Sequence, residues 1–489
     1  MNRYHTLYLS AVLYFLFSHP VQSQDFEEPY FPVSPVKVSP ARMDYLKKKL
    51  DSDTKLISDK PKEQREYIGS RYKNRFEYFK SSIEDGDFLI DSDLEKYVHS
   101  LLDEILHNNT QITDEINLYI SRSTVPNAYS TGDGNIIFNI GLLNKLDNEA
   151  QISFVLSHEL AHQYLQHSRK SLYAKAEKYT SKDFQKAVKK TLKEDYGTRQ
   201  KLIDLAMPNA IADMRFSRQD ELEADSLGLV FFSKTRFTPE AGISLVERLD
   251  SIDNYYDQKP LELRMVFTCP EFPYQSKWEP EVHKSSLNVT EDEKTSLDDS
   301  LKTHPDCKDR KTALSRQIKN LKSTGKLWYA KDAQTYERIR VRAEEETIHV
   351  LFDRNYTGRM LFYTYQTLMK HPENIYARTM MAYGFARLNR LQNQHRVNEE
   401  FPNPIKDYEE NYNKMLGFFN NLHREETSKL SYYMIRPYQE TLLKFEDYQF
   451  TLAYSAYTGD KKDEYVKLKE AYLKMFPKGL YVELFNNLN

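Results

Sequence analysis

Two histidines and a glutamate in the middle of the chain have the spacing of a metal site. Residues 157–163 read SHELAHQ, a His-Glu-x-x-His pattern formed by His158, Glu159 and His162. On a helix, residues four apart share a face, so both imidazoles point the same way and can bind one Zn²⁺. Glu159 lies beside that face, where its carboxylate can take a proton from a water that the metal activates. The alternative is a chance match on a solvated helix, which the pentad alone leaves open.

The residues around this pentad predict a buried helix. Apolar residues recur at spacings of three and four between positions 152 and 160. Asp147 or Asn148 can cap the start of the helix, and Glu149 suits its positive N-terminal end. Unpaired polar groups in a protein interior are costly, so two imidazoles and a carboxylate on a buried helix require partners. A metal ion supplies these partners.

A second acidic segment offers a third metal ligand. Residues 217–225 read SRQDELEAD, in which Glu221 and Asp225 lie four apart and so share a helix face. A catalytic zinc held by two histidines needs a third protein ligand and an open coordination position, and Glu221 fits the ligand. Asp225 can orient a ligating histidine by accepting its other N–H. The alternative is a charged helix surface on which Glu223 is the important neighbour.

Short strands are expected ahead of the pentad helix. Residues 116–120 and 135–139 are rich in β-branched and aromatic residues, and a glycine-containing turn at 131–134 precedes the second segment. A small sheet there would wall the site, and its edge near residues 135–139 would pair with an extended peptide. The Lys-rich residues 169–200 predict a solvated helical hairpin or, alternatively, a mobile lid.

The rest of the chain predicts helices. Residues 41–107 and 317–489 carry helical periodicity, and residues 360–387 and 442–478 each resemble the helix pair of a tetratricopeptide repeat. A plain helical domain is the alternative for this C-terminal part. The predicted fold class is therefore mainly α with a small β-sheet (α+β), in which a helical domain follows the domain that carries the pentad.

The first residues have the features of a signal peptide. Arg3 precedes an apolar run at 7–17 that is too short to span a bilayer, and Ser23 ends a small-residue cleavage site. An uncleaved membrane anchor is the alternative. Residues 24–40 carry four prolines and predict an extended linker. No later stretch reaches the ~18 apolar residues of a transmembrane helix. The mature chain is thus expected to be exported without a transmembrane helix, to the periplasm or else the extracellular medium.

Composition and cysteine content narrow the class of protein. Lys and Arg total 69 against 72 Asp and Glu, a net charge of -3 that argues against a nucleic-acid partner. The two cysteines, Cys269 and Cys307, lack zinc-finger spacing. In an oxidising compartment they either pair as a disulfide or stay as thiols.

The motifs between residues 125 and 228 resemble one group of zinc metallopeptidases, which includes the CAAX prenyl endopeptidase, HtpX, the mitochondrial Oma protease and BepA. The residues that carry the resemblance are Val125-Pro126-Asn127-Ala128, Gly132, Gly134, Ile137, Gly141-Leu142-Leu143, Glu149, Val155 to His162, His167, Ser217-Arg218, Glu221, Ala224-Asp225 and Gly228. The resemblance covers roughly residues 90–315. It implies a zincin-like peptidase of the gluzincin type that binds one zinc per chain, with Glu221 as the third ligand.

The overall plan is similar to the BepA-like branch of this group, with a signal peptide, a peptidase domain and a C-terminal tetratricopeptide domain. In that branch a histidine in a His-Pro loop can take the fourth zinc position and keep the enzyme latent. His304-Pro305 is similar to that loop, although residues 263–303 look like an insertion ahead of it. The resemblance also implies that the C-terminal domain recruits proteins, including the outer-membrane protein assembly machinery.

These inferences divide the chain into a signal peptide (1–23), a linker (24–40), a helical segment (41–90), a zinc metallopeptidase domain (91–320) and a tetratricopeptide-like domain (321–489). The predicted function is an exported zinc endopeptidase that cleaves misfolded or unassembled envelope proteins. The rival is a peptide-binding chaperone or assembly factor with a latent, histidine-plugged zinc site. A membrane-surface protease is a third hypothesis, which rests on the Lys-rich residues 169–200 alone.

Overall fold

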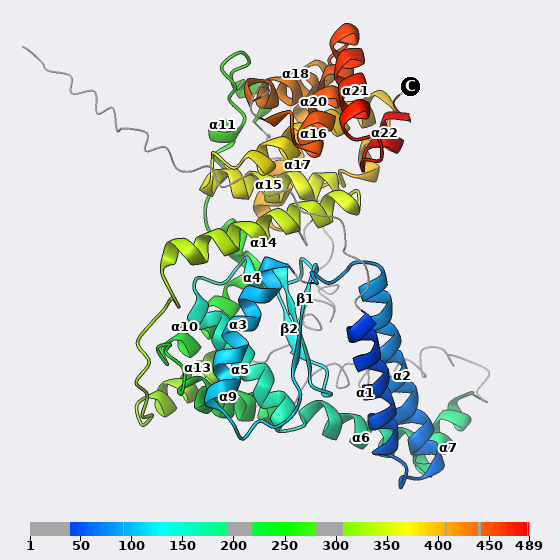
Figure 1. Cartoon of the computed structure of the whole chain (residues 1–489), viewed down its shortest axis with the longest axis vertical. Helices are drawn as coiled ribbons and strands as arrows, with labels where there is room; N and C mark the ends of the chain where they lie inside the picture. The colour runs from blue at the N-terminus through cyan, green and yellow to red at the C-terminus, as the bar shows by residue number, and fades with distance from the viewer. Residues whose placement is uncertain are drawn as a thin grey trace, which may run out of the picture.

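The computed structural model describes residues 40–90, 92–192, 218–279, 307–405, 408–438, 442–486 and 488. The predicted signal peptide, the linker up to residue 39 and His304 lie outside the described residues. The chain forms two lobes, with helix α14 (Ala333–Asp353) at their junction (Figure 1). The predicted class, mainly α with a small sheet and a helical C-terminal part, is confirmed. None of the described helices is both long and apolar enough to cross a bilayer.

The first lobe is built around a three-stranded sheet. Its strands are β1 (Asn117–Ser121), β2 (Ala128–Ser130) and β3 (Asn135–Asn139), in the order β1-β3-β2. Strand β3 pairs in parallel with β1 and antiparallel with β2, so it is the central strand. The expected substrate edge near residues 135–139 is therefore wrong, because both sides of β3 are already paired. The edge strands are β1, which makes an isolated bridge to Phe88, and β2, which is only three residues long and gave no clear pattern in the sequence.

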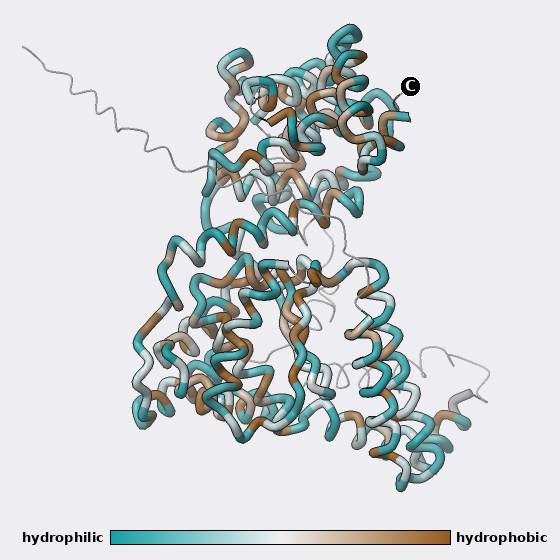
Figure 2. Tube along the Cα trace, in the orientation of Figure 1, coloured by the Kyte–Doolittle hydropathy of each residue, from teal (hydrophilic) through white to brown (hydrophobic). Residues whose placement is uncertain are grey.

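Helices surround this sheet, and the first lobe takes the chain as far as α10 and again from residue 307 to 318. Their bounds are α1 (Pro40–Lys55), α2 (Lys62–Glu84), α3 (Asp93–Asn108), α4 (Ile140–Leu143), α5 (Glu149–Tyr164), α6 (His167–Thr180), α7 (Lys182–Leu192), α9 (Arg218–Phe232), α10 (Ala241–Asp250) and α13 (Cys307–Ile318). Helices α1 and α2 stand across the sheet from α5 and α9 (Figure 1). The apolar residues gather between the elements of both lobes, whereas the outer turns are hydrophilic (Figure 2).

Helix α5, which carries the pentad, is the buried centre of the first lobe. Every residue from Glu149 to Gln163 is buried, and the side chain of Asn148 caps the helix by accepting from the backbone N–H of Gln151 at 3.0 Å. Helix α9 lies directly against α5, and Gly228 permits this approach. A Cβ atom at Gly228 would lie 3.1 Å from the backbone N and Cα of His158. The absence of a side chain at position 228 thus brings the backbones of the two site-bearing helices together.

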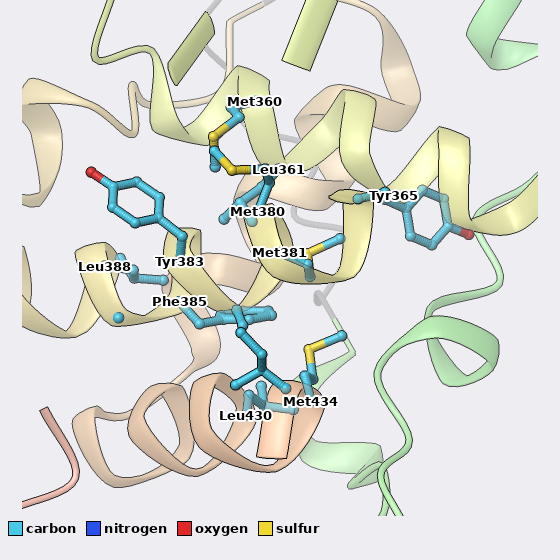
Figure 3. Close-up of a cluster of buried hydrophobic side chains, with 14 of the residues drawn as sticks. Met360, Leu361, Tyr365, Met380, Met381, Tyr383, Phe385, Leu388, Leu430 and Met434 are labelled. Carbon is cyan, nitrogen blue, oxygen red and sulfur yellow. The ribbon is translucent and has the colours of Figure 1, made fainter. Parts of the chain in front are cut away.

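The second lobe is a stack of helices with an aromatic and methionine-rich core. Its elements are α11 (Leu263–Val266), α15 (Thr357–Lys370), α16 (Ile375–Asn393), α17 (Glu410–Asn421), α18 (Arg424–Ile435), α20 (Glu446–Thr458), α21 (Lys462–Met475) and α22 (Val482–Asn486), with 3₁₀ turns η1 (Ile252–Asp257), η2 (Ser276–Trp278), η4 (Val397–Glu399) and η5 (Arg436–Tyr438). Figure 3 shows side chains of α15, α16 and α18 meeting in this core, among them Met360, Phe385 and Met434.

The two cysteines lie in different hydrophobic cores. Cys269 is buried in the core of the second lobe, and Cys307, on α13, packs against the core of the first lobe. They form no disulfide with each other. The disulfide weighed from the sequence is thus wrong for this structure, because the residues following α10 leave the first lobe and pack among the C-terminal helices before α13 returns.

Candidate metal centre

Three predicted ligands meet where α9 crosses α5. The Nε2 atoms of His158 and His162 lie 3.0 Å apart. The Glu221 carboxylate faces both rings, with Oε2 3.5 Å from His158 Nε2 and Oε1 3.5 Å from His162 Nε2. A tetrahedral zinc ion with bonds of about 2.0–2.2 Å separates its ligand atoms by about 3.3–3.6 Å. The spacing of the three donor atoms therefore suits zinc with little adjustment.

The chemistry of these donors also suits a catalytic zinc site. Two imidazoles and a carboxylate are a donor set that zinc accepts, and three protein ligands leave a fourth coordination position open. All three side chains are buried. Burial lowers the pKa of His158, but the carboxylates of Asp225 and Glu221 outweigh burial and raise this pKa to about 10. The surroundings of the imidazole thus favour a positive charge, which either a proton or a metal ion can supply.

Asp225 and Arg310 hold the ring of His158. The Nδ1 atom of His158 lies 3.0 Å from Oδ1 of Asp225, the contact expected of a carboxylate that orients a ligand. Arg310, on α13, donates to both oxygens of Asp225 at 2.7 Å, and its Nη1 lies 3.8 Å from Glu221. Burial raises the pKa of Asp225, but Arg310 and His158 outweigh it and lower this pKa to about 2. The Asp225 carboxylate is therefore ionised.

His162 has a different partner, His167. Their Nδ1 atoms lie 2.9 Å apart, and His167 is buried at the first position of α6. The other ring nitrogen of His167 lies 3.6 Å from Asp220 and 3.5 Å from Glu223, both in the first two turns of α9. Glu223, the alternative acidic residue of the sequence analysis, is exposed and groups with His167 rather than with the three ligands.

Glu159 lies beside the metal centre, at the end of β2. Its Oε2 accepts from the backbone N–H of Ser130 at 2.8 Å, and the side chain is buried. A cleft opens next to it. The cleft is lined by His158, Glu159 and Arg310, by the aliphatic side chains of Leu142, Val155, Leu245 and Leu249, and by Pro126, Asn127 and Ala128. The carboxylate thus borders both the ligand cluster and an apolar cavity.

The edge of β2 borders the same cleft. Asn139 donates to the carbonyl of Asn127 and Thr131 donates to that of Asn135, each at 3.0 Å. In an antiparallel ladder, alternate residues face the partner strand, so the backbone groups of Ala128 and Ser130 point away from β3. Ser130 meets Glu159, and Ala128 lines the cleft. The backbone of Ala128 is therefore placed to pair with an extended chain.

Sequence reasoning assigned no role to three residues of this site. Arg310 lies 85 positions from Asp225 and belongs to no local pattern. His167 was noticed only as part of a motif, and Ser130 lies in the missed strand β2. The predicted plug, His304, and the residues between α7 and α9 lie outside the described part of the chain, so the structure describes neither.

Comparison with a known family places this site in context. The family model described as Peptidase family M48 matches residues 92–318. The matched span contains the sheet, α5, α9 and α13, and with them every residue of the metal centre. Helices α14 to α22 lie outside it.

Individual relatives match the same part of the chain. The beta-barrel assembly-enhancing protease of Escherichia coli (strain K12) is 24% identical over 192 residues, which cover 36% of this chain and 37% of the relative. The mitochondrial metalloendopeptidase OMA1 of Schizosaccharomyces pombe is 29% identical over 157 residues, covering 32% and 44%. The OMA1 of Saccharomyces cerevisiae is 28% identical over 177 residues, covering 35% and 48%. The chain thus spans less than half the length of each of these relatives.

Proposed function

Because residues 92–318 belong to peptidase family M48, we propose that this chain is an exported endopeptidase in which His158, His162 and Glu221 hold one zinc ion. The observation that carries the proposal is the convergence of these three donor atoms within 4.8 Å of one another, beside Glu159 and a small cleft. A site that only stabilised the fold would need neither a carboxylate such as Glu159 beside the ligands nor a cavity in front of them.

The residues divide the catalytic work among them. Zinc, when bound, polarises the scissile carbonyl and makes a water molecule more acidic. Glu159 takes the proton of the attacking water and later delivers it to the leaving amine. The N–H of Ser130 donates to Oε2 of Glu159 and holds this carboxylate beside the ligand cluster. Asp225 holds the ring of His158 in the orientation in which Nε2 faces His162 and Glu221, the residues that would hold the ion with it.

The cleft supports a specific class of substrate. A polypeptide in extended conformation would pair with the backbone of Ala128 at the edge of β2. The four aliphatic side chains that line the cleft, Leu142, Val155, Leu245 and Leu249, would receive an aliphatic side chain next to the scissile bond. The proposed substrate is therefore an unfolded segment that exposes leucine-like residues, as misfolded or unassembled proteins do.

The expected signal peptide supports export, with the periplasm as the compartment. The similarity to proteins named beta-barrel assembly-enhancing proteases supports envelope proteins as substrates, and a link to the outer-membrane assembly machinery. Helices α15 to α22 of the second lobe, which lie outside the matched peptidase span, would recruit these proteins. His304 remains the proposed latch that fills the fourth zinc position.

The test is digestion of an unfolded protein such as casein, together with zinc analysis, for wild type, Glu159→Gln, His158→Ala and His304→Ala. We expect one zinc per chain in wild type and in Glu159→Gln, and none in His158→Ala. Glu159→Gln should lower the cleavage rate by roughly 10²–10⁴-fold, and His304→Ala should raise it. Full activity in Glu159→Gln would contradict the mechanism. Absence of cleavage in every variant, His304→Ala included, would favour the chaperone.

A further inference from the structure

We propose that His167 is a positioning residue that fixes the tautomer and the ring orientation of His162. The inference rests on the proposed zinc site and adds a residue to which neither the motif analysis nor the family match assigns a role. It starts from the contact between the two Nδ1 atoms, which lie 2.9 Å apart. Both rings are buried, with His162 1% and His167 3% exposed, so bulk water does not compete for this contact.

The contact has one consistent arrangement of protons when His162 is a ligand. The Nε2 atom of His162 faces His158 and Glu221, so Nε2 carries the lone pair that binds the metal. The proton of the neutral ring then lies on Nδ1, which donates to His167. Nδ1 of His167 must therefore be the acceptor, and the proton of His167 lies on its Nε2. That atom faces the carboxylates of Asp220 and Glu223, which suit a donor.

The two ligand histidines are thus held by different chemistry. His158 meets the carboxylate of Asp225, whose charge Arg310 balances. His162 meets a second imidazole, that of His167, whose other ring nitrogen faces Asp220 and Glu223. Such outer hydrogen bonds orient metal ligands and raise their basicity, and their loss typically weakens metal affinity 10–100-fold.

The fold places His167 for this task. Gln166, between α5 and α6, has a φ of 57°, a left-handed conformation that ends one helix and turns the chain into the next. His167 follows at once, so its ring returns towards His162, one turn earlier on α5. Helix α6 is anchored further along by Ala176, which is buried with Ile68 and Tyr72 of α2. The contacts of His167 with Asp220 and Glu223 connect the start of α6 to α9, the helix that carries Glu221.

The test compares two substitutions at position 167 in the full-length chain. His167→Leu removes the acceptor and keeps an apolar side chain in the buried space. His167→Asn restores an acceptor, because its amide oxygen can take the place of Nδ1. The matched control is His349→Leu, which removes another buried imidazole, one that contacts Tyr376 in the second lobe. The readouts are zinc affinity by competition with a chelator, and the visible spectrum of the cobalt-substituted protein.

We expect His167→Leu to weaken zinc binding 10–100-fold and to change the cobalt spectrum. His167→Asn should stay within a few-fold of wild type, and His349→Leu should leave both readouts unchanged. Wild-type zinc affinity in His167→Leu, or equal losses in the Leu and Asn variants, would overturn the role of His167 alone. Absence of zinc from wild type would overturn the site itself. A second zinc in wild type that Asp220→Asn/Glu223→Gln removes would instead make His167 a metal ligand.

A measurement on wild type keeps the proposal falsifiable if His167→Leu fails to fold. Histidine ¹⁵N spectra of the zinc-loaded protein report which ring nitrogen carries the proton, and His167→Asn identifies the signals of His167. We expect Nε2, rather than Nδ1, of His167 to carry the proton. A proton on Nδ1 of His167 would overturn the proposal, because Nδ1 could then not accept from His162.

Discussion

The two lobes bury polar side chains in opposite ways. In the second lobe most buried polar side chains are neutral; Ser431 meets Ser455 at 2.6 Å, and Asn389 meets Thr427 at 3.2 Å. Its buried carboxylates, such as Glu400 with Arg387, are spread over the lobe rather than gathered at one point. In the first lobe, α5, α9 and α13 bury a cluster of charged and titratable groups around one point. Hydrogen-bonded neutral pairs have a small desolvation penalty when buried, whereas a buried cluster of charged groups has a large one. This difference indicates that packing stabilises the second lobe, whereas the first lobe concentrates the charged and titratable side chains that could carry out a reaction.

The largest effect should come from breaking the charged cluster. Arg310→Met leaves the Asp225 carboxylate buried without its guanidinium, and removing one partner of a buried ion pair lowers the free energy of unfolding by about 3–5 kcal/mol. Zinc would supply part of the missing positive charge, so the loss should be smaller in the zinc-loaded protein. Urea unfolding with and without zinc measures both values.

Arg396→Met is the control for Arg310→Met, because Arg396 forms an exposed ion pair with Glu399. Its removal should leave stability unchanged within error. Equal stability of Arg310→Met and wild type without zinc would contradict the view that the first lobe depends on charge compensation.

The reverse experiment removes a core side chain from the second lobe. Phe385 is fully buried against Phe267 and Phe419, and Phe385→Ala should lower the free energy of unfolding by about 3–5 kcal/mol. Zinc affinity should not change, because the residue touches no part of the metal centre. Tyr457→Ala, at an exposed position, is the control. A parallel loss of zinc would mean that the lobes act as one unit.

A smaller effect is expected where the two site-bearing helices touch. Gly228→Ala places a Cβ 3.1 Å from the backbone of His158, so α9 must move away from α5. Overpacking of this kind lowers the free energy of unfolding by about 1–3 kcal/mol, and zinc affinity should fall with it because Glu221 moves too. Gly69→Ala, in α2, has no atom within 4 Å of the new Cβ and should instead stabilise by about 0.5–1 kcal/mol. The same sign for both substitutions would refute the close approach.

The smallest effect concerns the choice of substrate. Leu249→Ala widens the cleft, and loss of aliphatic contact in a pocket changes discrimination by about 1–3 kcal/mol. We therefore expect kcat/KM for peptides with leucine next to the scissile bond to fall about tenfold, with alanine-containing peptides little affected. An equal fall for both peptides would show that Leu249 lies outside the subsite.

Much of the metal centre could be predicted from the sequence because its spacing is local. The four-residue interval between His158 and His162 is set by helix geometry. Glu221 and Asp225 share the same interval on α9, and the structure brings all four together as that interval suggested. The strands β1 and β3 and the helical character of the C-terminal part were equally accessible, because each follows from the periodicity of its own residues.

The sequence by itself thus determined which side chains come together as candidate donors, the carboxylate beside them and the class of fold. Only the tertiary structure decided that β3 is the central strand, that Cys269 and Cys307 lie in different cores, and that Arg310, His167 and Ser130 surround the ligands. These facts depend on how helices and strands far apart in the chain pack together. Helical and strand periodicity report which side of an element is buried, and they carry no information about which partner covers it.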